Sequence, residues 1–283
     1  MWDVMKRTII IEHRKVGPGQ PVFIVAEAGI NHGGDVETAK KMIKEAAECG
    51  VDAIKFQTYI TEKRTDKKSP IYGVLKKCEL DKDEFRELFF FAKKHKIIFF
   101  STPFDKESVD LLAALPVPVF KVASFYIVNL GLLEYMATKN RPIIASTGMA
   151  NTKEISQAVK IFEKHGVDYA LLHCVSAYPT KEEDVNLRIM TALREKFKCV
   201  VGYSDHTLNI KVPIYSVALG ASILEKHFTL DKNLEGPDHK LSADPGDFKK
   251  MVSEIRQLEK VLGFEEIRLL DAEKGSLQYR KYS

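Results

Sequence analysis

Short apolar segments alternate with longer amphipathic segments along most of this sequence. Eight segments rich in Val, Ile, Phe and Ala have the length of β-strands, and they span residues 22–29, 52–58, 97–103, 119–124, 142–148, 169–174, 200–206 and 223–229. Between them, apolar residues recur every three to four positions, as in VETAKKMIKEAAECG (36–50) and PGDFKKMVSEIRQLEKVLG (245–263). This is the spacing of amphipathic helices, so the pattern predicts a series of strand–helix repeats.

The nearly continuous apolar character of the predicted strands indicates a parallel sheet that is buried on both faces. Eight strand–helix repeats are the number that closes into a TIM barrel. The alternative is an open doubly wound sheet, which needs no eighth repeat and usually has a GxGxxG turn after its first strand. The turn here reads AGINHGG (28–34). The sequence therefore predicts the α/β class and a (β/α)8 TIM barrel.

Three segments differ from the strand–helix repeats. TIIIEHRKVGPGQP (8–21) predicts a β-hairpin that turns at Gly-Pro-Gly and covers the floor of the barrel. The segment 58–80 is long and polar, as active-site loops often are. The helical pattern fades after Gly263. We expect an N-terminal hairpin in residues 1–21, a catalytic barrel in residues 22–263, and a tail or linker in residues 264–283.

Composition and charge exclude several functional classes. The net charge is +4 and the basic residues are spread over the predicted helices, which does not indicate nucleic-acid binding. The four cysteines show neither a CxxC motif nor the spacing of a disulfide framework, as is typical of a reducing compartment. The sequence shows no signal-peptide pattern and no apolar run of membrane-spanning length. We therefore expect a cytoplasmic protein without nucleic-acid or membrane partners.

Polar side chains gather at the C-terminal ends of the predicted strands, which is where TIM barrels have their active sites. In strand order, they are Glu27, Asn31 and His32; Lys55 and Gln57; Ser101 and Thr102; Lys121 and Ser124; Ser146 and Thr147; Ser176 and Tyr178; Ser204, Asp205 and His206; and Glu225 and His227. Any one of them has an ordinary structural explanation. A barrel without a function would not place polar groups at one end of every strand, so the sequence predicts an active site there.

The strand-end residues fall into two chemical sets. Cations and hydroxyls without carboxylates beside them suit a phosphate or a phosphorylated anion, and this set consists of Lys55, Lys121, Ser101, Thr102, Ser124 and Ser146. Glu27, His206 and His227 combine a carboxylate with imidazoles, which suits a divalent transition metal that keeps positions open for water and substrate. A single histidine is more often a core residue than a ligand, and the pair on adjacent strand ends is what favours a metal.

Several stretches together resemble the sialic acid synthase family. They occur in order from about residue 20 to residue 260, and their combination is much more specific than any one of them. The stretches are AEAGINHGG (26–34), IKFQTY (54–59), FFSTPFD (99–105), FKVAS (120–124), IIASTGMA (143–150), LLHCVSAYPT (171–180), GYSDHTL (202–208), ALGASILEKHFT (218–229) and GPDHKLSADPGDF (236–248).

The resemblance implies an activity, a cofactor and a set of site residues. The activity is the condensation of phosphoenolpyruvate with an N-acylated hexosamine, typically N-acetylmannosamine, to give a nonulosonic (sialic-type) acid and phosphate. The implied cofactor is a divalent metal, usually Mn2+, on His206 and His227, with Glu27 as a further catalytic residue. The positions that match the phosphoenolpyruvate site are Lys55, Thr102, Lys121, Ser124, Ser146, Ser176 and Ser204. The positions that match the sugar site are Glu27, Gln57, Tyr178 and Asp238.

The sequence departs from the family pattern at three places. Phe125 and Tyr126 follow the serine of the fourth strand, where relatives often have Gly and an acid, and Ser176 stands where Asn is common. Family members usually append an antifreeze-like domain that supplies an arginine to the sugar site of the partner subunit, whereas this sequence ends at Ser283. We expect a homodimer, and a separate antifreeze-like protein is a further expected partner. These departures leave the identity of the sugar open.

Three other functions remain as alternatives. A related 3-deoxy-sugar-acid synthase would use a phosphorylated aldose and would need a second basic cluster for the distal phosphate. A Schiff-base aldolase on Lys55 or Lys121 would need no metal. A sugar-binding barrel without activity would have little use for a metal beside a phosphate site. The sequence favours the metal-dependent condensation over all three.

Overall fold

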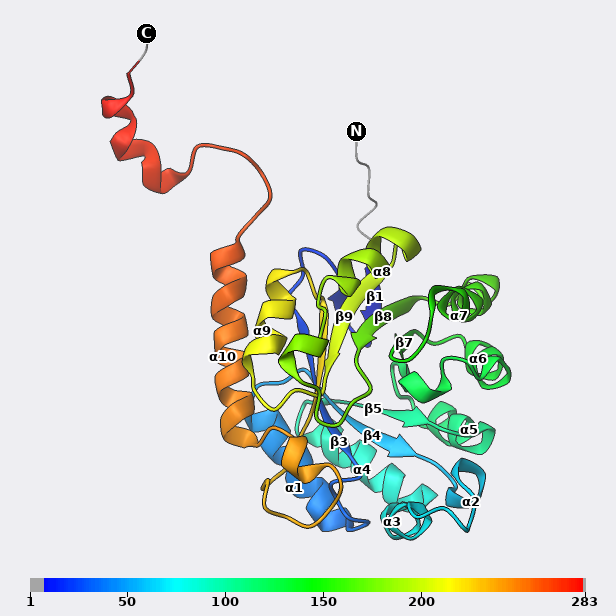
Figure 1. Ribbon diagram of the computed structural model, residues 1–283. Helices are drawn as coiled ribbons and strands as arrows, with labels where there is room; N and C mark the ends of the chain where they lie inside the picture. Colours follow the sequence, from blue (N-terminus) through cyan, green and yellow to red (C-terminus); the bar gives the residue numbers. More distant parts are fainter. Residues whose placement is uncertain (1–7, 282–283) are drawn as a thin grey trace.

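The computed structural model of the protein describes residues 8–281, so the first seven residues of the predicted hairpin segment and the last two of the predicted tail lie outside this description. Eight parallel strands form a closed barrel in the order β10-β3-β4-β5-β6-β7-β8-β9 (Figure 1). The strands are β3 (Phe23–Gly29), β4 (Ala53–Thr58), β5 (Ile98–Pro103), β6 (Phe120–Val122), β7 (Ile143–Ser146), β8 (Tyr169–Cys174), β9 (Val200–Asp205) and β10 (Ile223–His227). The predicted TIM barrel is confirmed.

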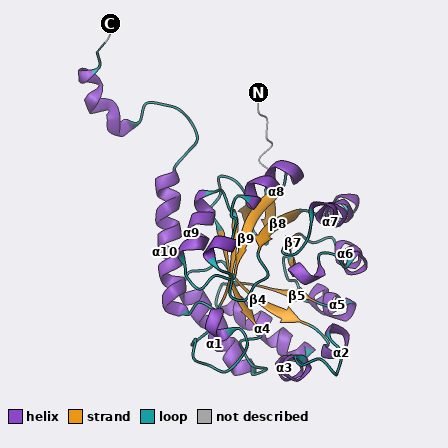
Figure 2. Ribbon diagram, viewed as in Figure 1, coloured by secondary structure: helices purple, strands orange, loops and turns teal. Residues whose placement is uncertain are grey.

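Helices surround the strands on the outside of the barrel (Figure 2). The α-helices are α1 (Val36–Glu48), α2 (Thr61–Arg64), α3 (Tyr72–Cys78), α4 (Lys82–Lys94), α5 (Lys106–Ala114), α6 (Leu130–Ala137), α7 (Thr152–Lys164), α8 (Ile189–Phe197), α9 (Lys211–Ala218) and α10 (Pro245–Leu262). Within residues 8–281, short 3-10 helices span Ser124–Tyr126, Glu182–Asp184, His239–Leu241 and Asp271–Tyr279. The predicted polar loop 58–80 contains α2 and α3, so it is more ordered than its composition indicates.

The helix α4 shows how the sequence sets these elements. Asp81 caps its first turn and forms a reciprocal capping box with Glu84, which satisfies backbone N–H groups that have no partner inside the helix. Its buried residues are Phe85, Leu88, Phe89 and Ala92, a spacing that places them on one face of a helix. This face packs toward the barrel, because α4 contacts β5.

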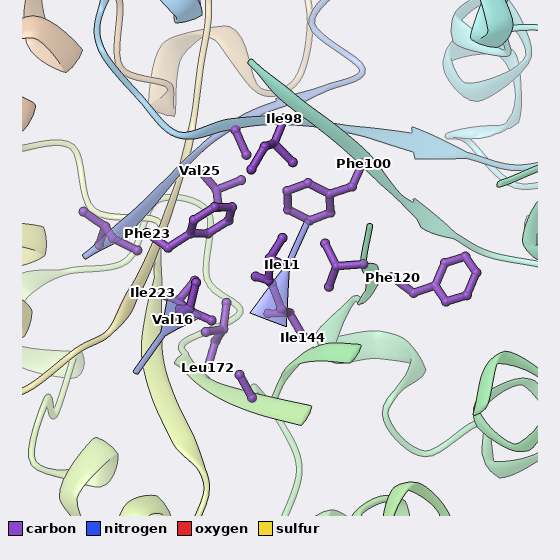
Figure 3. Packing of buried hydrophobic residues seen from close by; sticks show 14 of the residues in the cluster. Ile11, Val16, Phe23, Val25, Ile98, Phe100, Phe120, Ile144, Leu172 and Ile223 are labelled. Carbon is purple, nitrogen blue, oxygen red and sulfur yellow. The ribbon is translucent and has the colours of Figure 1, made fainter. Parts of the chain in front are cut away.

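The hairpin consists of β1 (Ile9–Ile11) and β2 (Arg14–Val16), which pair antiparallel. Its turn lies at Glu12 and His13, so the predicted turn at Gly-Pro-Gly is wrong; those residues follow β2. The side chains of Ile11 and Val16 are fully buried and lie among residues of the barrel interior such as Phe23 and Ile223 (Figure 3). Phe23 and Ile223 are the first residues of their strands. The hairpin therefore covers the N-terminal end of the barrel, as predicted, and leaves the C-terminal end for the site.

After α10 the chain runs away from the barrel and forms the 3-10 helix Asp271–Tyr279 (Figure 1). Among the described residues, no helix combines the length and the hydrophobicity that crossing a membrane requires.

Substitution of Gly202 in β9 tests the tightness of packing inside the barrel. A Cβ atom at this position would overlap the carbonyl oxygen of Ile223 and lie 2.7 Å from Cδ2 of Leu172. Because the carbonyl of Ile223 is backbone of the adjacent strand β10, it cannot move without disturbing the sheet. We expect Gly202→Ala to lower the free energy of unfolding by about 1–3 kcal/mol in a urea titration. Gly73 in α3 has no atom within 4 Å of such a Cβ, so Gly73→Ala is the control and should not destabilise; equal effects would contradict this account.

Candidate active site

The C-terminal ends of the strands surround a cavity of about 230 Å³. The predicted site residues that line it are Glu27, Lys55, Gln57, Thr102, Lys121, Ser124, Ser146, Tyr178, Ser204, His206, His227 and Asp238. Parallel strands point alternate residues to the same side, so Glu225 and His227 of β10 face inward together. The register places Glu27 opposite both Lys55 and His227 on the neighbouring strands. The fold therefore brings residues from all parts of the sequence into one cavity.

Ser176, which the resemblance implies as a phosphoenolpyruvate contact, does not line this cavity. Its hydroxyl is buried without a hydrogen-bond partner and lies 2.5 Å from the position that a Cβ atom on Gly148 would take. It therefore lies behind Gly148, close to Ser124, whose hydroxyl accepts a hydrogen bond from Gly148 N at 3.1 Å. The predicted direct contact between Ser176 and phosphoenolpyruvate is not favoured by this position.

Buried charges form a compact cluster in the cavity. Lys55 Nζ lies 2.6 Å from Glu27 Oε2 and 3.8 Å from Glu225 Oε2. Lys121 Nζ lies 3.5 Å from Glu225 Oε1. The prediction that the two lysines have no carboxylates beside them is therefore wrong. The strand-end pattern identifies these polar residues but does not show which of them meet across the barrel interior, and it gives no role to Glu225.

The two carboxylates of this cluster differ in their proton affinity. Burial raises the pKa of Glu27 to about 7, although Lys55 acts in the opposite direction. Burial also acts to raise the pKa of Glu225, but Lys121 and Lys55 outweigh it and hold this pKa below its ordinary value. Glu225 is thus the permanent negative partner of the lysines. Glu27 is the carboxyl that can exchange a proton near neutral pH.

Hydroxyl groups extend the lysine cluster toward the cavity. Lys55 Nζ donates to Thr102 Oγ1 at 3.1 Å, and Lys121 Nζ donates to Ser146 Oγ at 2.7 Å. Ser204 Oγ donates to Glu225 Oε1 at 3.1 Å. Ammonium groups and hydroxyls at these separations offer several donors to one anion. The arrangement fits the binding of a phosphate or carboxylate.

The two predicted metal ligands lie side by side, with their ring centres 5.4 Å apart. His206 Nδ1 lies 2.8 Å from the carbonyl oxygen of Val175. A carbonyl oxygen only accepts, so Nδ1 donates, and Nε2 is the ring nitrogen left for a metal. His227 Nδ1 is buried without a hydrogen-bond partner and lies 3.8 Å from Asp238 Oδ2. Burial lowers the pKa of His227, which favours the neutral imidazole that binds metals.

A buried ion pair that sequence reasoning missed joins the strand ends that carry these histidines. Lys226 Nζ donates to Asp205 Oδ2 and to the carbonyl oxygen of Thr207, and Asp205 Oδ1 accepts from Thr207 N at 3.0 Å. Lys226 precedes His227 and Asp205 precedes His206. The pair therefore holds the backbone on both sides of His206 and directly before His227.

Loss of this ion pair should destabilise the protein strongly. The side chains of Lys226 and Asp205 are 1% and 0% exposed, and removal of one partner leaves a buried charge without compensation. We expect Lys226→Met to lower the free energy of unfolding by about 3–5 kcal/mol. Lys250 pairs with Glu254 on the surface at 70% and 47% exposure, so Lys250→Met serves as the control and should change stability by less than about 1 kcal/mol. Similar effects of both substitutions would show that the buried pair is not needed.

Several cavity residues were not predicted as site residues. Arg64 comes from α2, and Phe104 follows β5. Phe125, one of the departures from the family pattern, also lines the cavity, while Tyr126 packs edge-on against Phe104 at 4.9 Å between ring centres. In the sequence, Arg64 is one arginine in a polar segment. It belongs to no motif that would identify it as a site residue.

Other strand-end residues support the loops and do not line the cavity. Asn31 Nδ2 donates to the carbonyl oxygen of Phe228 and to Ser242 Oγ. Ser101 Oγ shares a hydrogen bond with Thr58 Oγ1 at 2.7 Å. These residues connect the ends of neighbouring segments, which explains their polarity without a catalytic role.

A cluster of lysines and hydroxyls lies beside two imidazoles at the C-terminal end of a TIM barrel, an arrangement that fits a barrel enzyme for an anionic substrate. Residues 42–266 match the NeuB family. The chain belongs to this family and is an enzyme of the sialic acid synthase type, which confirms the resemblance seen in the sequence.

Similar proteins include synthases of N,N'-diacetyllegionaminic acid and of N-acetylneuraminic acid. An uncharacterized protein of Methanocaldococcus jannaschii is 54% identical, with 90% of this chain and 76% of that protein covered. The N,N'-diacetyllegionaminic acid synthase of Campylobacter jejuni is 45% identical, with 85% and 77% covered. The crystal structure of an N-acetylneuraminic acid (sialic acid) synthetase from Leptospira borgpetersenii superposes with a TM-score of 0.94 at 41% identity, with 97% of this chain and 96% of that chain covered.

Proposed function

We propose that this enzyme condenses phosphoenolpyruvate with an N-acylated hexosamine to form a nonulosonic acid and phosphate. The observation that carries the proposal is the single cavity in which Lys55 and Lys121, with their hydroxyl partners, lie beside His206 and His227. The names of the similar synthases from Campylobacter jejuni and Leptospira borgpetersenii support the same class of product.

The lysine and hydroxyl cluster is our proposed phosphoenolpyruvate site, formed by Lys55, Thr102, Lys121, Ser124, Ser146 and Ser204. Glu27 and Glu225 already balance the two lysines, so anion binding also depends on the hydroxyl donors and on positive charge from a metal. Charge-assisted hydrogen bonds hold phosphate groups well. They also stabilise the charge that the leaving phosphate develops.

His206 and His227 are the proposed ligands of a divalent metal, for which we propose Mn2+. His206 Nε2, the ring nitrogen left for a metal, and the buried, unpartnered Nδ1 of His227 fit this role. The described residues contain no cluster of three or more His, Cys, Asp or Glu side chains at metal-binding separations, so water or substrate would complete the ligand set. The metal, when bound, would act as a Lewis acid toward the aldehyde oxygen of the open-chain sugar.

The proposed reaction forms a carbon–carbon bond to the sugar and a carbon–oxygen bond to water, and it breaks the carbon–oxygen bond to phosphate. C3 of phosphoenolpyruvate attacks the aldehyde carbon, whose oxygen takes up a proton. C2 becomes cationic and adds water, which loses a proton. The tetrahedral species then releases phosphate as its new C2 hydroxyl loses its proton and becomes the keto oxygen. Glu27, with its pKa raised to about 7, is placed to exchange one of these protons. The sugar is held by Glu27, Gln57, Tyr178 and Asp238 in this proposal.

A phosphate-release screen tests this function. The enzyme with phosphoenolpyruvate and Mn2+ should release phosphate with N-acetylmannosamine or related N-acylated sugars. Turnover with phosphorylated aldoses instead would favour a 3-deoxy-sugar-acid synthase. Borohydride trapping of a lysine adduct with pyruvate would favour the Schiff-base aldolase, and sugar binding without turnover would favour a binding protein.

Four further features of the protein are predicted as part of this proposal. They are a homodimer, a cytoplasmic location, a separate antifreeze-like protein as partner, and the division into a hairpin, a catalytic barrel over residues 22–263 and a tail. Sedimentation analysis of the purified protein would test the first of them directly.

A further inference from the structure

The guanidinium group of Arg64 lies in the cavity wall and makes few polar contacts. Its Nη1 donates to Gln57 Oε1 at 2.9 Å, and its guanidinium carbon lies 3.8 Å from the ring centre of Phe104 and 4.5 Å from that of Tyr59. Within residues 8–281, no carboxylate lies at ion-pair distance from it. Burial lowers the pKa of Arg64, but an arginine keeps its charge in proteins. A partly buried cation therefore remains available to a ligand.

The two aromatic rings hold this guanidinium in a defined orientation. Stacking on aromatic faces stabilises the cation and restricts its rotation. A guanidinium has five N–H donors, and the Gln57 contact uses one of its nitrogens. Because Arg64 lines the cavity, the remaining donors can meet a hydrogen-bond acceptor of the substrate without reorganisation of the side chain.

The surroundings of Arg64 are apolar. A small buried cluster, separate from the main core, consists of Ile30, Tyr59, Leu75, Cys78 and Phe104, and three of these residues also line the cavity: Ile30, Leu75 and Phe104. This apolar wall suits a methyl group. It does not suit a phosphate, which is strongly hydrated and usually needs more than one cation.

Polar side chains lie near Gly29, on the side of Gln57 away from Arg64. A Cβ atom on Gly29 would lie 3.5 Å from Gln57 Nε2, 3.5 Å from Glu27 Oε1 and 3.8 Å from Asp238 Oδ2. Asp238 and Glu27 also act on the pKa of Arg64 through their charges. Arg64 and the Gln57 amide share this part of the cavity with the carboxyl groups of Glu27 and Asp238, so a second phosphate would lie close to two acidic side chains here.

We propose that Arg64 determines the sugar specificity of the enzyme by donating hydrogen bonds to the carbonyl oxygen of an acylamino group, whose methyl packs against Ile30 and Leu75. This inference rests on the proposed function, and it assigns the group of the sugar that is recognised and the residue that recognises it. An acylamino group combines an acceptor with a methyl, which matches the combination of guanidinium and apolar wall. A neutral acylated sugar fits this environment better than a phosphorylated one.

Steady-state kinetics of Arg64→Met test this proposal. We expect the Michaelis constant for N-acetylmannosamine to rise about tenfold to a hundredfold, because a hydrogen bond from a charged donor is lost. The constant for phosphoenolpyruvate should stay unchanged, and the preference for N-acetylmannosamine over mannose should fall. The matched control is Lys63→Met, because Lys63 lies on the same helix and pairs with Glu107 on the surface; it should behave like the wild type.

Ligand-observed NMR gives a second readout that does not depend on turnover. In saturation-transfer experiments with phosphoenolpyruvate present, the N-acetyl methyl of N-acetylmannosamine should receive the strongest transfer in the wild type and in Lys63→Met, and a weaker transfer in Arg64→Met. Binding that changes in this way without any turnover would support the Arg64 assignment and contradict the proposed function. Turnover with an unchanged sugar constant and unchanged transfer in Arg64→Met would overturn the assignment alone. Tighter use of N-acetylmannosamine 6-phosphate that is lost in Arg64→Met would also overturn it, since phosphate would then be the recognised group.

Discussion

His206→Ala and His227→Ala should each lower turnover by on the order of a hundredfold or more, while the proteins remain folded. Loss of a hydrogen-bond partner of a metal ligand already costs about 10–100-fold in affinity or activity, and the proposed ligands should matter at least as much. Both imidazoles lie at strand ends and face the cavity, so their truncation removes no large part of the core. Turnover, metal content and the circular dichroism spectrum of each variant are the measurements.

The control for the histidine variants is His13→Ala. The side chain of His13 is 77% exposed in the hairpin at the opposite end of the barrel, and its removal should leave turnover and metal content unchanged. A chelator should abolish the activity of the wild type, and Mn2+ or Co2+ should restore it. Full activity in the chelator, or in either cavity variant, would contradict the metal role of the pair.

Lys121→Met should raise the Michaelis constant for phosphoenolpyruvate by about tenfold or more, with a much smaller effect on the constant for the sugar. The ammonium group of Lys121 contacts Ser146 Oγ at 2.7 Å and faces the cavity. A charge-assisted hydrogen bond contributes about 1.5–3 kcal/mol, and about 1.4 kcal/mol corresponds to tenfold. Steady-state kinetics with each substrate varied in turn measure this difference.

Two further variants separate the anion contact of Lys121 from its effect on the charge cluster. After the substitution, Lys55 is the remaining lysine that pairs with Glu225, with Lys55 Nζ 3.8 Å from Glu225 Oε2. Lys121→Met/Glu225→Gln removes both charges and should recover stability but not the affinity for phosphoenolpyruvate. Lys139→Met, at a surface pair with Asp110, is the control for loss of a lysine. An unchanged constant for phosphoenolpyruvate in Lys121→Met would place this lysine outside the anion site.

The barrel could be predicted from the sequence because its strands are buried on both faces and therefore read as continuous apolar runs. The inward position of site residues also follows from strand periodicity, as for Glu225 and His227 two residues apart on β10. The turn of the hairpin could not be located in the same way. Gly-Pro-Gly is the stronger turn motif, but the pairing of Ile9 with Val16 requires a two-residue turn at Glu12 and His13, where Glu12 adopts a positive φ of 58°.

The contacts within the site could not be predicted, because they join strands that are far apart in the sequence. Glu225 meets Lys121 and Lys55 across the interior of the closed barrel, and no periodicity of one strand encodes that meeting. Arg64 was missed for a different reason. It enters the cavity from a four-residue helix inside the segment 58–80, and its aromatic partners Tyr59 and Phe104 come from two different connections.

The bond that breaks in phosphoenolpyruvate tests the central claim most directly. In the proposed reaction water adds at C2, so the bridging oxygen leaves with phosphorus. Phosphoryl transfer would instead cleave the phosphorus–oxygen bond and leave that oxygen on the pyruvyl carbon. Phosphoenolpyruvate with heavy oxygen in the bridge, incubated with the enzyme, Mn2+ and the N-acylated sugar, should give labelled phosphate and an unlabelled sugar acid by mass spectrometry. Label retained in the organic product would contradict the condensation, whatever the histidine and lysine variants show.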